Sequence, residues 1–377
     1  MRRLVSSKVH YMVLSTTIQS ALLRHQQRID AALHQALRDV YDEAAQMFYG
    51  QMQYHLGWVD TQFAPTHNNP GKLLRPTLLL LAYEAAGAWG LTASATASSD
   101  YLRRALPAAA AVELTHNFTL IHDDIEDSDE ERRHRTTLWR QWGIPQAINT
   151  GDGLFALSRL SLWKVLDEGV EGTIAARLGA ALDRACLILA EGQYLDISFE
   201  QRLDISVAMY IDMIGRKTAA LMGCATEMGA MLGTRDQNVI ESLRNFGWAI
   251  GVAFQVRDDL LGVWASMEML GKTQSGDIYR RKKSLPILYA LEHASESDKH
   301  FLQSVYQQKD TLTDEQVRNV LAVFERTHTR DYCHEFLMQQ CQSAYQALAQ
   351  VPQQGNSIAE RALHDMNMIV RFVEEVL

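Results

Sequence analysis

Apolar side chains recur at steps of three and four residues along most of this chain, which is the period of an α-helix with one buried face. The first such stretch covers residues 20–49, where charged and amide side chains separate Ile29, Leu33 and Leu37. Further helices are expected at residues 77–86, 154–166, 173–195, 205–232 and 239–261. Because no stretch keeps a period of two for long enough to form a strand, the pattern predicts an all-α fold.

Three stretches interrupt the helical pattern. Prolines bound residues 65–70, and residues 87–100 are small and rich in Ala and Ser, which predicts a surface loop. Residues 136–152 are expected to form another loop, before the apolar helix that follows the Gly-Asp-Gly sequence at 151–153. None of these breaks establishes a domain boundary, so we expect one all-α domain over residues 20–377, preceded by an N-terminal extension at residues 1–19.

The densest cluster of chemically active residues follows the apolar stretch around Leu114 and Ile121. If this stretch is helical, Asp123 and Asp127 lie one turn apart on the same face, about 5–6 Å between Cβ atoms. Carboxylates at that separation can share divalent ions, and hard oxygen ligands suit magnesium. The adjacent Arg132 and Arg133 have the planar fork that binds phosphate oxygens. The alternative is a solvated, acidic helix end, since residues 127–131 are mostly charged.

A second apolar helix also ends in two aspartates, Asp258 and Asp259. If the two helices face each other, carboxylates line both sides of one cavity. Basic and polar residues that could bind phosphate lie between or after the two acidic motifs: Lys217, Thr218, Lys272, Lys282 and Lys283. Each is most simply a surface residue when taken alone, and Asp258 and Asp259 could serve only as a cap or an ion pair. Together with Asp123 and Asp127 they form a coherent set for metal and phosphate binding.

Composition supports a helical globular protein. The 377 residues include only 7 prolines and 22 glycines, and 47% are hydrophobic, so long helices and a sizeable core are possible. The net charge of −9, with no basic tail, argues against a nucleic-acid partner. The four cysteines show no paired short spacing, which favours neither zinc nor a disulfide framework and fits a cytoplasmic protein. No signal peptide or integral membrane span is expected.

The order and spacing of these motifs resemble those of the trans-isoprenyl diphosphate synthases, over most of the chain from about Gly71 to Pro286. The resemblance rests on Gly71 to Pro76, His116, Asp123 to Asp127, Arg132 and Arg133, Lys217 and Thr218, Phe254 to Asp259, Gly271 and Lys272, and Asp277 to Pro286. It implies a single large bundle of long helices around a central cavity, magnesium as the cofactor and a homodimer.

The resemblance also implies a role for each matching residue. The magnesium ligands would be Asp123, Asp127 and Asp258. The isopentenyl diphosphate site would comprise Lys72, Arg75, His116 and Arg133. The allylic diphosphate site would comprise Arg132, Lys217, Thr218, Gln255 and Lys282. Three positions depart from the usual pattern: Gly262 replaces a third aspartate of the second motif, Leu73 an arginine, and His134 a glycine. The Gly262 change removes one possible ligand or water contact on that side, while Asp258 and Asp259 remain.

The implied reaction is ionisation of an allylic diphosphate, followed by attack of the isopentenyl double bond on the allylic cation. Among these residues, Asp123, Asp127, Arg132, Lys217 and Asp258 would serve catalysis. Phe118 lies five positions before Asp123, about 7.5 Å deeper along the helix, beside the smaller Thr119. An aromatic ring there accompanies short products in the family, which indicates geranylgeranyl diphosphate, with farnesyl diphosphate next. The alternative is that Phe118 only packs between helices.

Two other functions share this architecture. A terpene cyclase needs the metal site and a single substrate, but the presence of Lys72, Arg75 and Arg133 argues for a second diphosphate site. A non-catalytic partner subunit would have no physical need for buried, paired carboxylates such as Asp123 and Asp127.

Overall fold

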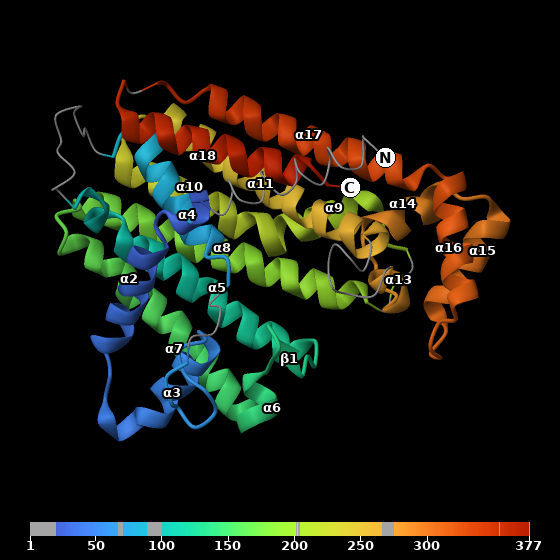
Figure 1. Ribbon diagram of the computed structural model, residues 1–377, viewed down its shortest axis with the longest axis horizontal. Helices are drawn as coiled ribbons and strands as arrows, with labels where there is room; N and C mark the ends of the chain where they lie inside the picture. The colour runs from blue at the N-terminus through green and yellow to red at the C-terminus, as the bar shows by residue number, and fades with distance from the viewer. Residues whose placement is uncertain are drawn as a thin grey trace.

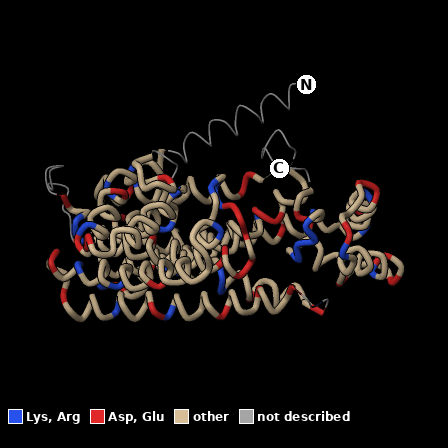
Figure 2. The backbone as a smooth tube through the Cα atoms, turned by 90° about the horizontal axis from the view of Figure 1, so that it is seen from below, with Lys and Arg blue, Asp and Glu red and all other residues tan. Residues whose placement is uncertain are grey.

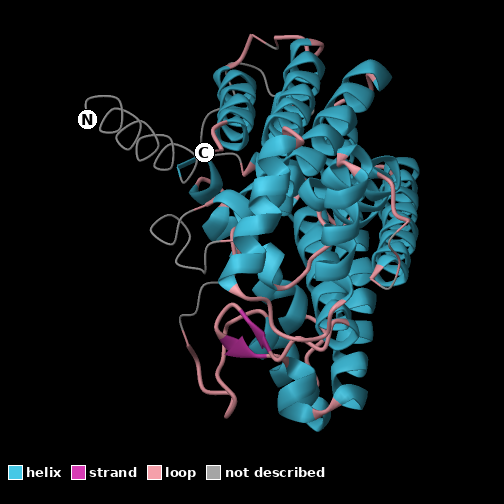
Figure 3. Cartoon of the chain, turned by 90° about the vertical axis from the view of Figure 1, so that its right-hand side faces the viewer, coloured by secondary structure: helices cyan, strands magenta, loops and turns pink. Residues whose placement is uncertain are grey.

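A computed structural model describes residues 20–66, 71–88, 100–200, 202, 204–265, 275–353 and 355–376. Over this part of the chain the protein is built almost entirely of helices, with one short two-stranded hairpin (Figures 1 and 3). The all-α fold predicted from the apolar period is therefore confirmed. None of the helices formed by the described residues is both long and apolar enough to cross a lipid bilayer.

The N-terminal half contains these elements in chain order: α2 (Gln26–Arg38), η1 (Glu43–Ala45), α3 (Gln46–His55), α4 (Leu74–Ala85), η2 (Tyr101–Arg104), α5 (Leu106–Glu126), β1 (Glu131–Arg132), β2 (Arg135–Thr136), α6 (Leu138–Trp142), α7 (Ile144–Trp163), η3 (Lys164–Leu166) and α8 (Gly172–Phe199).

The C-terminal half continues with α9 (Val207–Ile214), the π-helical η4 (Gly215–Ala219), α10 (Ala220–Gly233), α11 (Gln237–Trp264), α13 (Gly276–Tyr279), α14 (Leu285–His293), α15 (Glu296–Gln307), α16 (Asp314–Arg326), α17 (Thr329–Ala349) and α18 (Ser357–Glu374).

The centre of the bundle is formed by α4, α10 and α11, with α5 packed against α7 and α17 against α11 (Figure 1). Helix α10 is buried along almost its whole length because its sequence is Ala-, Met- and Gly-rich. A Cβ added at Gly229 would lie 2.1 Å from the Leu79 carbonyl oxygen, so the glycine is what permits α10 to lie this close to α4. Acidic and basic positions gather midway along the molecule (Figure 2).

Two of the predicted boundaries are wrong. The helix expected over residues 20–49 ends at Arg38, and a second begins at Gln46, because Asp42 accepts a hydrogen bond from the Ala44 amide and starts a new turn. The loop expected over residues 136–152 is mostly helical. Gly143, at φ 85°, separates α6 from α7, and a proline in the first turn begins α7.

Gly151 and Gly153 explain the second error, because they lie inside α7 and are needed for close packing there. A Cβ at Gly151 would meet His122 Nε2 at 2.4 Å, and one at Gly153 would meet Phe48 and Met52 at the same distance. The remaining predicted helices correspond to α4, α8, α9 to α10, and α11. A capping box of Thr313 and Gln316 begins α16, and the four cysteines are free. Lys272, residues 1–19 and most of the loop expected at 87–100 lie outside the described residues.

Candidate active site

The acidic stretch forms the C-terminal end of α5, as the sequence predicts. Asp127 is the C-cap, and its amide donates to the Asp123 carbonyl one turn earlier. Burial and the neighbouring Asp123 carboxylate raise the pKa of Asp127 to about 6. Asp124 is only 2% exposed, and burial raises its pKa to about 6 although Arg132 opposes the shift. Several carboxyl groups are therefore concentrated at this end of α5, and their negative charge favours the binding of cations.

A short hairpin carries the paired arginines. Strands β1 and β2 pair antiparallel, and the two residues between them, Arg133 and His134, both have positive φ, at 54° and 60°. That is the geometry of a two-residue hairpin turn, in which glycine is favoured and His134 is tolerated at some conformational cost. Arg132 donates to Asp124 at 2.5 Å and to Asp123 at 3.1 Å. The hairpin is thus held against the end of α5.

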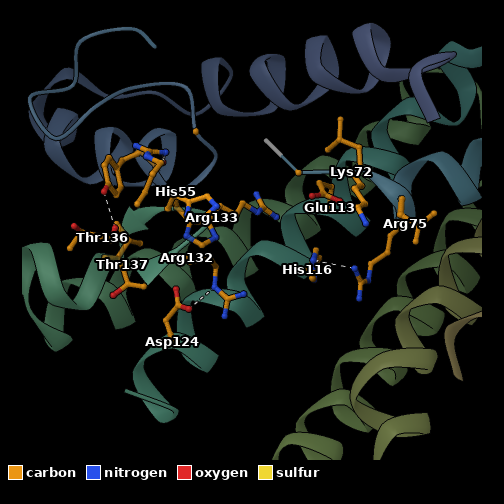
Figure 4. A pocket seen from close by; sticks show the side chains of 18 of the residues that line it. His55, Lys72, Arg75, Glu113, His116, Asp124, Arg132, Arg133, Thr136 and Thr137 are labelled. Atoms are coloured by element: carbon orange, nitrogen blue, oxygen red, sulfur yellow. Dashed lines mark hydrogen bonds and ion pairs between the residues drawn. The ribbon is translucent and has the colours of Figure 1, made fainter. Parts of the chain in front are cut away.

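One cavity among the described residues has a volume of about 680 Å³ and lies between α3, α4, α5, the hairpin and α11 (Figure 4). Four of its residues were predicted for the isopentenyl diphosphate site, namely Lys72, Arg75, His116 and Arg133, and the structure brings them together. Arg132 and Asp258, predicted for the allylic and metal sites, line the same cavity.

Glu113, which the motif search missed, lies in this cavity among the arginines. It is 3% exposed, and its burial raises its pKa while Arg75 and Arg133 lower it. Arg75 Nη1 lies 3.1 Å from His116 Nε2, and burial together with nearby arginines keeps the pKa of His116 well below its usual value. His116 is therefore a neutral imidazole whose Nε2 accepts from Arg75. A glutamate within an otherwise apolar helix could have been recognised from the sequence, because a buried acid needs a counter-charge.

A second, smaller cavity of about 220 Å³ lies on the other side of Arg75 and His116, which line both cavities. Asp123, Lys217 and Thr218 line it, as do Phe118 and Thr119. Most of the predicted site residues are therefore divided between two neighbouring cavities, whereas Asp127, Gln255 and Lys282 line neither of them.

Lys217 lies between acidic groups beside this second cavity. Its Nζ is 3.1 Å from Asp123 Oδ1 and 2.6 Å from Asp196 Oδ2. Asp196, from the last turn of α8, was missed because its importance comes from its ion pair with Lys217, which lies far along the sequence. The neighbouring Gln193 donates to Glu126 at 2.8 Å. These contacts join the ends of α5 and α8 to the π-helical turn η4.

The second pair of aspartates is divided between two environments. Asp258 lines the first cavity, and its pKa is raised by burial. Asp259 is fully buried and accepts hydrogen bonds from Tyr210 at 2.6 Å and from the Leu285 amide at 3.2 Å. Gln255 and Lys282, predicted for the allylic site, both contact Asp259, at 3.3 and 3.4 Å. Gln255 also accepts from Thr218 at 3.4 Å, which links Asp259 to the second cavity.

Gly262, the departure from the usual second motif, lies against another carboxylate. A Cβ at Gly262 would meet Asp277 Oδ2 at 2.2 Å. Asp277 is 5% exposed and pairs with Arg280 at 2.6 Å and with Lys282 at 3.9 Å. The space that a side chain at position 262 would need is thus taken by Asp277. Across the described part of the chain, no three acidic, imidazole or thiol side chains are grouped closely enough to hold a metal ion by themselves.

Phe118 is positioned by a second aromatic ring. Its centroid lies 5.1 Å from that of Phe155 on α7, edge to face, and 5.9 Å from that of His122. Arg159 lies over the other ring, with Cζ 3.7 Å from the Phe155 centroid, and pairs with Asp183 on α8. The Phe118 ring is therefore both in contact with a neighbouring helix and at the wall of the second cavity.

Comparison with known proteins places the chain in one family. The polyprenyl synthetase family model matches residues 57–324. The chain is 36% identical over 291 residues to a (2E,6E)-farnesyl diphosphate synthase and, equally, to a geranylgeranyl diphosphate synthase, both of Mycobacterium tuberculosis. The first alignment covers 77% of this chain and 76% of the relative, the second 77% of each. The fold is similar to that of a polyprenyl synthetase from Streptomyces coelicolor A3(2), with a TM-score of 0.81, 32% identity, and coverage of 94% and 99%.

Proposed function

Because this chain belongs to the polyprenyl synthetase family, we propose that it condenses isopentenyl diphosphate with an allylic diphosphate to give a short-chain isoprenyl diphosphate of 15 to 20 carbons. One observation of the site carries this proposal. Two cavities with basic side chains adjoin each other and share Arg75 and His116. Two diphosphate substrates need two such sites, with their hydrocarbon parts close enough to react.

The acids at the end of α5 fit a magnesium ion. Carboxylate oxygens are the ligands magnesium prefers, and one or two of them together with substrate phosphates complete its usual coordination. The Lys217 ammonium already lies between Asp123 and Asp196, so a cation is accommodated at this position. Asp123, Asp127 and Asp258 would hold the metal, which when bound supplies positive charge to the diphosphate that leaves the allylic carbon.

The protein's own residues would orient both substrates. Lys217 and Thr218 line the second cavity and would hold the allylic diphosphate, whose carbon–oxygen bond breaks. Lys72 and Arg133 line the first cavity and would hold isopentenyl diphosphate, whose double bond attacks the allylic cation. A proton then leaves to the released diphosphate. Positive side chains aimed at the developing charge are among the strongest contributions to such catalysis.

The competing functions are tested together with this one. The purified protein is incubated with magnesium, isopentenyl diphosphate and dimethylallyl, geranyl or farnesyl diphosphate. Formation of a longer prenyl diphosphate supports the proposal. A cyclic hydrocarbon formed without isopentenyl diphosphate would identify a terpene cyclase, and binding without turnover would identify a non-catalytic subunit.

We also propose that the protein is a homodimer, because large apolar side chains are exposed along two neighbouring helices. On α7 these include Phe155, Leu160 and Trp163, and on α8 Leu187 and Tyr194. Exposed apolar surface that is contiguous marks interfaces between proteins. A monomeric sedimentation coefficient at micromolar concentration would rule the dimer out.

The two cavities can be tested separately because Lys72 lines only the first and Thr218 only the second. Replacing Lys72 with Ala is expected to raise KM for isopentenyl diphosphate about 10- to 100-fold, the effect of one charge-assisted contact worth ~1.5–3 kcal/mol. Thr218→Val is the matched variant and should mainly raise KM for the allylic substrate. Steady-state kinetics with each substrate varied in turn check both expectations. Equal effects on both substrates would show that the two sites are one.

Product length provides a further prediction. Two relatives that are each 36% identical in sequence to this chain are named for products of different length, farnesyl and geranylgeranyl diphosphate. Replacing Phe118 with Ala removes a ring from the wall of the second cavity, so longer prenyl diphosphates are expected from the same substrates. Reverse-phase analysis of the products measures this. Thr119→Ala is the control, because the side chain it removes is small. An unchanged product distribution in folded Phe118→Ala enzyme would mean that the ring only packs against Phe155.

A further inference from the structure

His55 is a histidine of the first cavity that the motif comparison did not include. It is the last residue of α3 and lies two positions before the start of the residues matched by the family model. The side chain lines the cavity together with Arg132, Arg133 and Arg135 (Figure 4). Burial, and then these three arginines, lower its pKa to about 3. The imidazole is therefore neutral at physiological pH, with one nitrogen protonated and the other free to accept.

The surroundings of His55 favour a proton on Nε2. Nε2 is buried and has no hydrogen-bond partner of ordinary geometry, and the same is true of the side-chain oxygen of Asn117. Asn117 is also the group whose hydrogen bonding opposes the fall in the His55 pKa, so the two side chains lie next to each other. An amide oxygen can only accept, which requires a proton on Nε2 and leaves the Nδ1 lone pair available to an arginine N–H.

Asn117 connects His55 to the acid that holds the arginines. Its Nδ2 donates to Glu113 Oε1 at 3.0 Å and to the Glu113 carbonyl at 2.8 Å, one turn earlier on α5. Glu113 in turn interacts with Arg75 and Arg133. Figure 4 shows Arg133 between His55 and Glu113. His55 and Glu113 therefore both interact electrostatically with Arg133, and Asn117 donates to Glu113.

We propose that His55 is a positioning residue for the first cavity: protonated on Nε2 and bound to Asn117, it holds Arg133 in the orientation that receives a diphosphate. This inference rests on the proposed function, in which Arg133 binds isopentenyl diphosphate. The position of His55 gives α3 a part in substrate binding, although α3 contributes none of the residues of the acidic and basic motifs.

Two substitutions of similar size separate this role from simple packing. In His55→Gln the side-chain amide N–H can take the place of Nε2–H, whereas in His55→Asn it reaches only as far as Nδ1. Affinity for isopentenyl diphosphate is measured by titration calorimetry without an allylic substrate, so that the result does not depend on turnover. We expect His55→Asn to weaken binding about tenfold, the effect of one hydrogen bond of ~1.4 kcal/mol, and His55→Gln to restore most of it.

His34→Ala is the matched control, because His34 stacks on Trp58, with ring centroids 3.7 Å apart, and lines neither cavity. Thermal melts establish that each variant is folded. Equal affinities of the Asn and Gln variants, or a loss as large in His34→Ala, would overturn the positioning role. If the wild-type protein binds isopentenyl diphosphate but forms no product, the proposed function fails while the role of His55 is still tested.

Discussion

Replacing Asp123 with Asn is expected to lower turnover by about 10²- to 10³-fold, as is typical when electrostatic stabilisation of the developing charge is weakened. The change keeps the size of the side chain and removes its charge. Asp123 lies at the junction of the α5 acids, Arg132 and Lys217, and it lines the cavity proposed for the allylic diphosphate. Loss of its charge therefore weakens metal binding and leaves two cations partly uncompensated.

The fold should survive this change because both cations keep another partner. Arg132 remains bound to Asp124 at 2.5 Å, and Lys217 to Asp196 at 2.6 Å. The measurements are kcat at increasing magnesium concentration and a thermal melt. Asp129→Asn is a suitable control, since Asp129 is an exposed acid of the same charged stretch. Turnover close to that of the wild type, with unchanged magnesium dependence, would contradict the assignment of Asp123.

The acidic helix ends were predictable because their signals are local. An apolar period followed by Asp123 and Asp127 specifies a buried helix whose end carries charge, and α5 has this form. The same reasoning found α11 and its aspartates. In each case one short stretch of sequence shows both the helical period of the apolar residues and the acidic side chains at the end of the helix.

Errors arose where the meaning of a residue depends on a distant neighbour. Gly151 looks like a helix breaker in sequence, but the nearby His122 of α5 makes a glycine necessary inside α7. Asp196 and Glu113 gain their importance from Lys217 and Arg75, which are separated from them by many residues. Local propensity contains no information about such contacts.

The resemblance implied two diphosphate sites, but the sequence does not determine which of the two cavities each side chain lines. The resemblance placed Arg132 in the allylic diphosphate site, and in the structure Arg132 lines the first cavity and contacts Asp123 and Asp124. The positive φ of Arg133 and His134 turns the hairpin at that point, so neighbouring arginines follow different directions. The direction of a side chain in a tight turn depends on backbone angles that residue type alone does not determine.

Asp259 provides the largest expected effect on stability. Its two oxygens accept from four donors: the Tyr210 hydroxyl, the Leu285 amide, Gln255 Nε2 and Lys282 Nζ. Asn at this position replaces one acceptor oxygen by an NH₂ group. That group would then point at the two donors that now bind the replaced oxygen. Because the site is fully buried, we expect the free energy of unfolding to fall by ~2–4 kcal/mol. The larger figure applies only if Lys282, which is half-exposed, cannot turn toward water.

Urea unfolding followed by circular dichroism measures this effect, and the neighbouring residue supplies the control. Asp258 lines the first cavity, so Asp258→Asn should lower turnover and change the free energy of unfolding by less than about 0.5 kcal/mol. Tyr210→Phe removes a single donor to Asp259 and should cost ~1–2 kcal/mol. A graded series, with Asp259→Asn lowest in stability, Tyr210→Phe intermediate and Asp258→Asn near the wild type, supports a structural Asp259 beside a catalytic Asp258. Equal stability of the two aspartate variants would contradict that division, because it would mean that the buried hydrogen bonds of Asp259 contribute no more to stability than the cavity-lining carboxylate of Asp258.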